Sequence, residues 1–323
     1  MIVTDLHGDG PAFDRICDSF LHGHANGTID HLLICGDLIH KPDPFDPTDD
    51  SLRMINELAR LHAELGPSTV TYLCGNHEMP HIYGQPLLRG DTNVTAPFEH
   101  AMSQANQRQE IVNFLADLPF FAYTSAGVLF THAGPTHEIA TPGAVEPLLN
   151  FDHHALIDHI DAQLVQYDLP HARTIYATQY GENYAVLAEH LLGATHESDP
   201  HYDHLLRGFF LGDDEAYQQL WQLLFSRCEQ ILPNDLRRVT VYESIVQNYL
   251  NAISTHLPEP QHIIVSGHIA TRGGHEVIDD YHFRLSTHAH AKPQAAGQYL
   301  LIDTNGTYRD ADDLVDNLRF VRS

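Results

Sequence analysis

The segment CGNHEMPHIYG, residues 74–84, places an amide, an imidazole and a carboxylate side by side at Asn76, His77 and Glu78. The apolar run before it predicts a strand that ends next to a glycine. The chain repeats this combination of an apolar strand, a glycine and an acidic or imidazole side chain in VTDLHGD (3–9), LLICGDLIHK (32–41), LFTHAGP (129–135) and IIVSGHIATRGGH (263–275). The repetition indicates one site assembled from the ends of several strands.

Composition limits the class of protein and of partner. The 323 residues are 43% hydrophobic, enough for a large core, and we expect one domain over residues 1–323. The 43 acidic against 17 basic residues give a formal charge of −26, which repels nucleic acid and anionic membranes. We therefore expect neither as a partner. A phosphate-containing substrate would need local cations, and a bound metal ion is the strongest of these.

The N-terminal segment lacks the basic and apolar regions of a signal peptide, and no apolar run approaches the roughly 20 residues of a membrane span. The four cysteines form no closely spaced pair, which argues against a disulfide framework. Together these features lead us to expect a cytoplasmic protein.

Strands and helices alternate in the first half of the chain. Residues 2–4, 31–35 and 69–73 predict strands, and residues 11–20 and 50–65 predict helices between them, which is typical of a layered α/β fold. Residues 140–256 show helical spacing almost throughout and are interpreted as a largely helical insertion, after which strand patterns return. The proline-bounded segments 42–47 and 86–97 indicate surface loops.

Potential metal ligands lie at the carboxyl ends of the predicted strands, where open α/β sheets place their ligand sites. Carboxylate, imidazole and amide oxygen suit borderline and hard divalent metals. A single histidine after a strand is more often structural, but five such segments in succession favour a metal site. Its candidate residues are Asp5, His7, Asp37, Asn76, His77, His132 and His268.

The order DLHGD, GDLIHK, GNHE, THAG and SGH resembles the calcineurin-like metallophosphoesterases, and most closely the branch of phosphoprotein phosphatases with bacterial and phage members. The resemblance implies a four-layer αββα sandwich with two divalent metals, manganese foremost and iron or zinc as alternatives. It implies that Asp5, His7 and Asp37 hold the first metal. Asp37 would bridge to the second, which Asn76, His132 and His268 complete.

The resemblance also implies a mechanism, in which a metal-bridging hydroxide attacks the phosphate ester. Asp37 and His77 are then the residues at the reaction centre, with His77 as the general acid that protonates the leaving alkoxide. Asn76 would also contact the phosphate, and Glu78 would support the ligand loops from behind. Alternatively, Glu78 pairs with Lys41 or caps the turn that follows it.

Two positions depart from the family pattern GDxxDRG, which here is GDLIHKP. The aspartate that normally orients the general acid is His40, and the phosphate-binding arginine is Lys41, which lacks a bidentate fork. Because His40 supplies no negative charge, we expect a weakened proton donor and a preference for aryl over alkyl phosphates. Arg272 is either a second phosphate-binding cation or part of a surface turn. His81 and His275 either join the site or pack at its rim.

Three functions follow from these observations. The first is a metal-dependent phosphomonoesterase that acts on a phosphorylated protein, at serine, threonine or tyrosine, or on a small phosphate ester. The second is a dinucleoside polyphosphate hydrolase, which the acidic composition and the single tryptophan disfavour. The third is a non-catalytic metal-binding regulator, which the complete ligand set disfavours.

Overall fold

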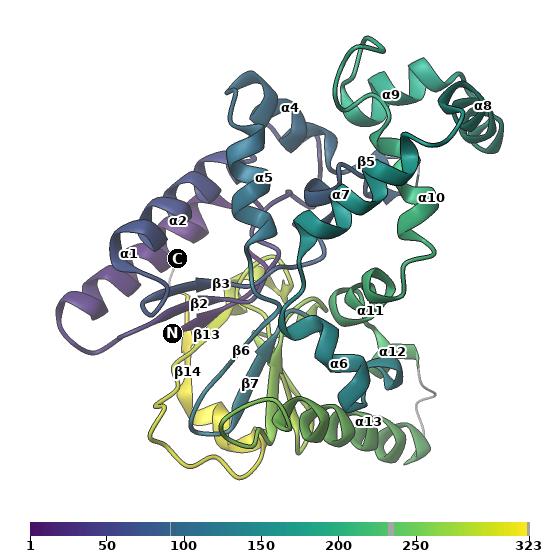
Figure 1. Ribbon diagram of the computed structural model, residues 1–323. Coiled ribbons are helices and arrows are strands. Elements are labelled where there is room, and N and C mark those ends of the chain that lie inside the picture. The colour runs from purple at the N-terminus through teal and green to yellow at the C-terminus, as the bar shows by residue number, and fades with distance from the viewer. Residues whose placement is uncertain (91, 232–235, 322–323) are drawn as a thin grey trace.

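Two five-stranded sheets pack face to face in the computed structural model, which describes residues 1–90, 92–231 and 236–321 (Figure 1). The first sheet has the order β14-β13-β1-β2-β3, and the second has the order β10-β11-β8-β7-β6. The strands of the first sheet are β1 (Ile2–Val3), β2 (Leu32–Ile34), β3 (Val70–Tyr72), β13 (Gln298–Leu300) and β14 (Leu318–Phe320). Those of the second are β6 (Phe121–Tyr123), β7 (Val128–Thr131), β8 (Ile263–Ser266), β10 (His275–Asp279) and β11 (His282–Leu285).

Successive side chains along each strand point alternately into two separate hydrophobic cores. Leu33 of β2 and Phe130 of β7 belong to one buried cluster between the sheets, whereas Ile34 and Leu129 belong to the cluster that includes the helices. Successive strand residues point to opposite faces, so a strand covered on both sides carries apolar residues at every position. This explains the continuous apolar runs of β2, β7 and β8.

Helices cover both outer faces. Helices α1 (Gly10–Ala25) and α2 (Ser51–Leu65) contact each other, and α2 contacts β3. On the opposite side, at the bottom of Figure 1, α13 (Leu236–Ser254) contacts β8. The arrangement confirms the expected α/β fold with its four αββα layers. Helix α13 is the last helix of the segment expected to be an insertion, and it covers the outer face of the second sheet.

Most of the segment 140–256 is helical, as the sequence predicts. It contains α6 (Pro142–Leu149), α7 (His153–Leu164), α8 (Leu169–Tyr180), α9 (Tyr184–Leu192), α10 (Gly208–Leu211), α11 (Glu215–Leu224) and α12 (Cys228–Ile231). Residues 232–235 of this segment lie outside the described residues. Within the part of the chain that the structure describes, no helix is both long and apolar enough to cross a membrane.

The prediction of a loop over residues 86–97 is confirmed for residues 86–87 and 94–95 and wrong for most of the others, and residue 91 lies outside the described residues. The short strands β4 (Leu88–Arg89) and β5 (Thr92–Asn93) pair there, and α4 (Ala96–Gln104) begins before the segment ends. Pro97 lies in the first turn of α4, where the missing N–H of proline has no helical partner to lose. Helix α4 contacts α2 and α5 (Arg108–Ala116), so tertiary packing stabilises a helix that its own sequence specifies weakly.

Candidate metal centre

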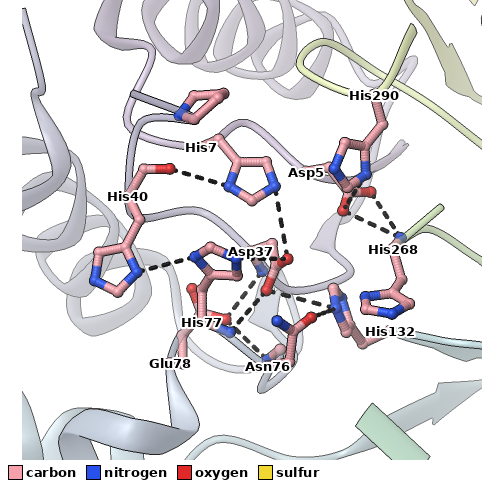
Figure 2. A network of polar contacts seen from close by, with 12 residues as sticks. Asp5, His7, Asp37, His40, Asn76, His77, Glu78, His132, His268 and His290 are labelled. Carbon is pink, nitrogen blue, oxygen red and sulfur yellow. Dashed lines mark hydrogen bonds and ion pairs between the residues drawn. The ribbon is translucent and has the colours of Figure 1, made fainter. Parts of the chain in front are cut away.

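The predicted ligands converge at one edge of the two sheets. Strands β1, β2 and β3 are parallel to one another, and so are β7 and β8, so the loops after them leave their sheets in a common direction. Figure 2 shows the side chains of these loops gathered around Asp37. All the predicted metal ligands are buried: Asp5, His7, Asp37, Asn76, His132 and His268.

Backbone strain is concentrated at this edge. Among the described residues, six non-glycine residues have a positive φ, and five of them are Asp5, His7, Asp37, His40 and His268. Left-handed backbone costs on the order of 1–3 kcal/mol per residue and persists where the surrounding structure enforces it. The strain therefore marks these loops as conformations retained for a purpose other than stability.

Close packing of the loops requires glycine at position 36. Gly36 has φ +84°, and a Cβ atom there would lie 2.5 Å from Nδ1 of His132 and 2.8 Å from the Cα of Gly75. A larger residue would separate the loops that follow β2, β3 and β7. This close approach gives the glycine next to Asp37 its structural role.

The donor atoms form three overlapping groups whose members lie within 4.8 Å of one another. Asp37 belongs to two of these groups, and His7 belongs to one of those two and to the remaining group. The groups are Asp5, His7 and His290; His7, Asp37 and His77; and Asp37, His132 and His268. An arrangement in which one carboxylate serves two groups is typical of two metal ions held side by side.

The hydrogen bonds of His132 direct a lone pair into the site. Its Nδ1 lies 2.9 Å from the carbonyl oxygen of Cys35, which can only accept, so Nδ1 donates and the neutral ring keeps a lone pair on Nε2. That Nε2 lies 2.8 Å from Oδ1 of Asn76 and 3.5 Å from Oδ1 of Asp37. Burial lowers the pKa of His132, which favours this neutral ring. Three electron-rich atoms thus face one another, an arrangement that a cation between them would satisfy.

Two further imidazole nitrogens of the predicted ligands have no hydrogen-bond partner among the described residues. His7 donates from Nδ1 to the carbonyl oxygen of His40 at 3.1 Å, which leaves Nε2 buried and unpartnered, 3.6 Å from Oδ2 of Asp37. Nε2 of His268 is also buried without a partner. Burial, followed by the charge of His290, lowers the pKa of His7 to about 3, so its ring is neutral at physiological pH. Buried unpartnered lone pairs are costly unless a bound metal uses them.

Three buried carboxylates add negative charge that only cations can balance. Asp5, Asp37 and Glu78 are each at most 1% exposed, and none of the lysines or arginines in the described residues is ion-paired with them. Burial, then the charges of Glu78 and Asp5, raises the pKa of Asp37 well above its usual range. Divalent metals would remove this repulsion, so the residues present fit a two-metal site.

A family model described as calcineurin-like phosphoesterase matches residues 1–216. The chain belongs to this family. No curated protein was found to match the sequence. Membership makes the protein a hydrolase of the metallophosphoesterase class, and the aspartate and histidine groups are consistent with a dimetal site.

Solved structures similar to this phosphoesterase include a cold-active protein tyrosine phosphatase, at 15% identity over 93% of this chain and 72% of that chain, with a TM-score of 0.48. A protein serine/threonine phosphatase from Saccharomyces cerevisiae matches at 14% identity over 92% and 68% of the two chains, with a TM-score of 0.45. A protein-tyrosine phosphatase of a psychrophilic Shewanella matches at 17% identity over 94% and 75%, with a TM-score of 0.43. Similarity at this level says nothing about the substrate of this phosphoesterase.

His290 of the phosphoesterase is a candidate ligand that the sequence analysis missed. Its Nδ1 lies 3.0 Å from Oδ1 of Asp5, and its charge and hydrogen bond outweigh the effect of burial and lower the pKa of that carboxyl. The available signal was the HAH sequence at 288–290, which follows β11. Because β11 is parallel to β8, its carboxyl end lies at the same edge as His268.

Glu78 holds two loops together from beneath the site. Its Oε2 accepts hydrogen bonds from the backbone N–H groups of Asp37 and Gly75, both at 2.9 Å, and its Oε1 accepts from that of Leu38 at 3.1 Å. The ion pair between Glu78 and Lys41 that the sequence left open is not formed. The carboxylate of Glu78 instead accepts hydrogen bonds from backbone N–H groups of the loops after β2 and β3.

Lys41 lies at the edge of the centre with an acidic partner of its own. Its Nζ is 3.1 Å from Oδ2 of Asp9 and 4.0 Å from Oδ2 of Asp46. With His7 and Lys292, it lines a cavity of about 210 Å³ next to the metal-ligand groups. A phosphate bound through Lys41 would therefore compete with Asp9.

Two other predicted candidates lie on the strands that follow His268. Arg272 is exposed on β9 (Thr271–Arg272), which pairs with β12 (Ala291–Lys292). His275 is half-buried on β10, where Nδ1 contacts Oε1 of Gln298 at 2.8 Å and the ring stacks on Phe283. The described contacts of His275 are therefore packing contacts on the second sheet.

His40 and His81 lie beside His77. Nδ1 of His40 is 2.9 Å from Nδ1 of His77, and Nε2 of His40 is 2.8 Å from Nε2 of His81. The backbone N–H of His77 donates to Oδ1 of Asp37 at 3.0 Å, and its Nε2 faces Oδ2 of Asp37 at 4.0 Å. Burial, followed by the charge of His7, lowers the pKa of His77 well below its ordinary value.

Proposed function

We propose that this calcineurin-like phosphoesterase is a metal-dependent phosphomonoesterase, with phosphorylated proteins or small phosphate esters as substrates. The observation that carries the proposal is the position of Asp37, shared between two donor groups. Each group contains one buried imidazole nitrogen, Nε2 of His7 or Nε2 of His268, that has no hydrogen-bond partner among the described residues. A regulator without catalytic activity would not need a general-acid candidate beside the same carboxylate. His77 occupies that position.

The donor groups suggest which residues would hold each metal. Asp5, His7 and Asp37, with His290 in addition, would hold the first, and Asp37, Asn76, His132 and His268 would hold the second. When bound, the two ions would supply positive charge for the phosphate oxygens and acidify a water molecule. The oxygen and nitrogen donors accept manganese, iron or zinc, and we propose manganese as the effective ion.

The residues around the metals have distinct proposed roles. His77 presents Nε2 toward Asp37 and would carry the proton that the leaving alkoxide needs. Asn76 and Lys41 would bind phosphate oxygens, and Arg272 would add a more distant cation. Glu78 would keep the loops of Asp37 and Asn76 in register.

A preference for aryl phosphates follows from the residue beside His77. A carboxylate next to the general acid would stabilise its imidazolium form, and the neighbouring His40 carries no negative charge. Alkyl leaving groups need the donated proton, whereas aryl leaving groups depend on it much less. General acid catalysis contributes about 10²–10⁴-fold where it is needed, so the preference should be measurable.

Metal analysis of the purified protein and a substrate panel test the proposal. The panel contains p-nitrophenyl phosphate, phosphotyrosine and phosphoserine peptides, and a dinucleoside tetraphosphate, each with manganese and with a chelator. Two bound metals and manganese-dependent release of phosphate from monoesters are the expected result. Hydrolysis of the dinucleotide alone would favour the polyphosphate hydrolase. Metal binding without turnover of any substrate would favour the regulator.

A further inference from the structure

A chain of three histidines runs from the metal centre to a carboxylate on α4. His77 contacts His40 through the two Nδ1 atoms at 2.9 Å, and His40 contacts His81 through the two Nε2 atoms at 2.8 Å. Nδ1 of His81 lies 2.6 Å from Oε1 of Glu99. All three rings are buried, and the side chain of Glu99 is only 14% exposed. Figure 2 shows the first of these contacts.

The carboxylate of Glu99 determines which nitrogen of each histidine donates and which accepts. Glu99 can only accept, so His81 donates from Nδ1, and a ring that carries its one proton on Nδ1 accepts at Nε2. His40 must then donate from Nε2 and accept at Nδ1, so His77 donates from Nδ1. The lone pair of His77 therefore lies on Nε2, the atom that faces Asp37. A carboxylate two rings away thus selects both the tautomer and the ring orientation of His77.

Glu99 is itself held in place and ionised. Its Oε2 accepts a hydrogen bond from Nε of Arg108 at 2.7 Å. Burial raises the pKa of Glu99, but His81 and Arg108 outweigh it and bring the pKa down to about 2. Phe98 packs edge-on against His81 and His40, with ring centroids 5.0 and 6.0 Å apart, and limits other orientations of both rings.

We propose that Glu99 is a positioning residue for phosphoester hydrolysis, acting on His77 through His81 and His40. The inference rests on the proposed function, in which His77 is the general acid. The attacking water forms the new P–O bond and gives a proton to the lone pair on Nε2 of His77. As the ester P–O bond breaks, its electron pair passes to the leaving oxygen, which takes that proton from Nε2. Glu99 keeps Nε2 aimed at the leaving group throughout.

Glu99→Gln tests the proposal without changing side-chain size. Arg108 would hold the amide oxygen, so the amide N–H₂ would face Nδ1 of His81 and reverse the hydrogen bonds of the chain. We expect kcat for a phosphoserine peptide to fall about tenfold to hundredfold, within the range of general acid catalysis. The kcat for p-nitrophenyl phosphate should change less than about threefold, and KM should change little for either substrate, because Glu99 does not touch substrate.

Two further variants separate positioning from packing. Glu99→Asp keeps the charge but shortens the side chain, so positioning predicts that it retains more alkyl phosphatase activity than Glu99→Gln. A purely structural role predicts the opposite order, because glutamine is isosteric. Glu110→Gln, an exposed substitution in the first turn of α5, is the matched control and should behave as wild type.

A double-mutant cycle locates the effect in the histidine chain. His40→Asp interrupts the contacts between His77 and His81, so adding Glu99→Gln to it should have no further effect on kcat. Proton NMR gives a readout independent of turnover, because the shared proton of His81 and Glu99 should give a downfield resonance that Glu99→Gln removes.

The outcomes distinguish this inference from the proposed function. Wild-type turnover of monoesters with manganese supports the proposed function alone. Equal losses on alkyl and aryl substrates in folded Glu99→Gln, no loss on either, or a full Glu99→Gln effect in the His40→Asp background would overturn the role of Glu99. A wild type that hydrolyses no monoester overturns both.

Discussion

Replacing Asp37 by asparagine should have opposite effects on the metal-free and metal-loaded proteins. The substitution preserves size and the hydrogen bond that the backbone of His77 donates to Oδ1 at 3.0 Å, and removes only the charge. Burial, then Glu78 and Asp5, raises the pKa of Asp37 well above 3.8. A carboxyl whose pKa rises on folding stabilises the fold at low pH, and this contribution is lost as pH increases toward the folded pKa. At neutral pH, Asp37→Asn should therefore leave the metal-free fold at least as stable as wild type.

With metal bound, wild type should be more stable than Asp37→Asn. A ligand at 100 times its Kd stabilises the native state by about 2.7 kcal/mol, so two independently bound metals would contribute about 5 kcal/mol. At about 2 °C per kcal/mol, wild type should gain about 10 °C in Tm. Because Asp37 belongs to two of the three donor groups, Asp37→Asn should lose most of this gain. Turnover of p-nitrophenyl phosphate should be nearly abolished.

Thermal unfolding followed by circular dichroism, with a chelator and with manganese, measures both effects in one experiment. Metal analysis of the same samples gives the stoichiometry. Asp18→Asn, an exposed substitution on α1, is the matched control. An Asp37→Asn protein that keeps two metals and near-normal turnover would refute the bridging role. A metal-free variant much less stable than wild type would refute the electrostatic reasoning.

Three other substitutions test individual residues. Lys41→Ala should lower kcat/KM for p-nitrophenyl phosphate by about tenfold, equivalent to about 1.4 kcal/mol. Lys41→Arg should retain or improve kcat/KM, because arginine can contact phosphate through two N–H groups. Unchanged kinetics in Lys41→Ala would show that Lys41 only pairs with Asp9. His40→Asp should raise kcat for phosphoserine peptides more than for p-nitrophenyl phosphate, and equal decreases in parallel assays would count against a weakened acid partner. His290→Ala should weaken binding of one metal by about tenfold to hundredfold in a calorimetric titration, and unchanged affinity would exclude it as a ligand or ligand support.

The sequence alone determined the layered fold and the members of the metal centre that follow its strands. Each is encoded locally, because an apolar strand, a glycine and a donor side chain are adjacent in the chain. The parallel arrangement then brings equivalent strand ends together, so Asp5, Asp37, Asn76, His132 and His268 could be grouped before their distances were known. Their exact roles at the metals remain predictions.

Only the tertiary structure decided the contacts between segments without such a local pattern. His290 reaches Asp5 because β11 pairs with β8 and the loop after β11 returns to the segment that follows β1. There the backbone N–H of Ala289 donates to the carbonyl oxygen of Asp5 at 3.1 Å. Glu99 reaches His81 because α4 packs on α2 and α5, although the first two residues of α4 fall in the segment predicted as a loop. Helix packing and strand order are cooperative properties of the whole core, so no short segment records which distant side chain completes a buried hydrogen-bond chain.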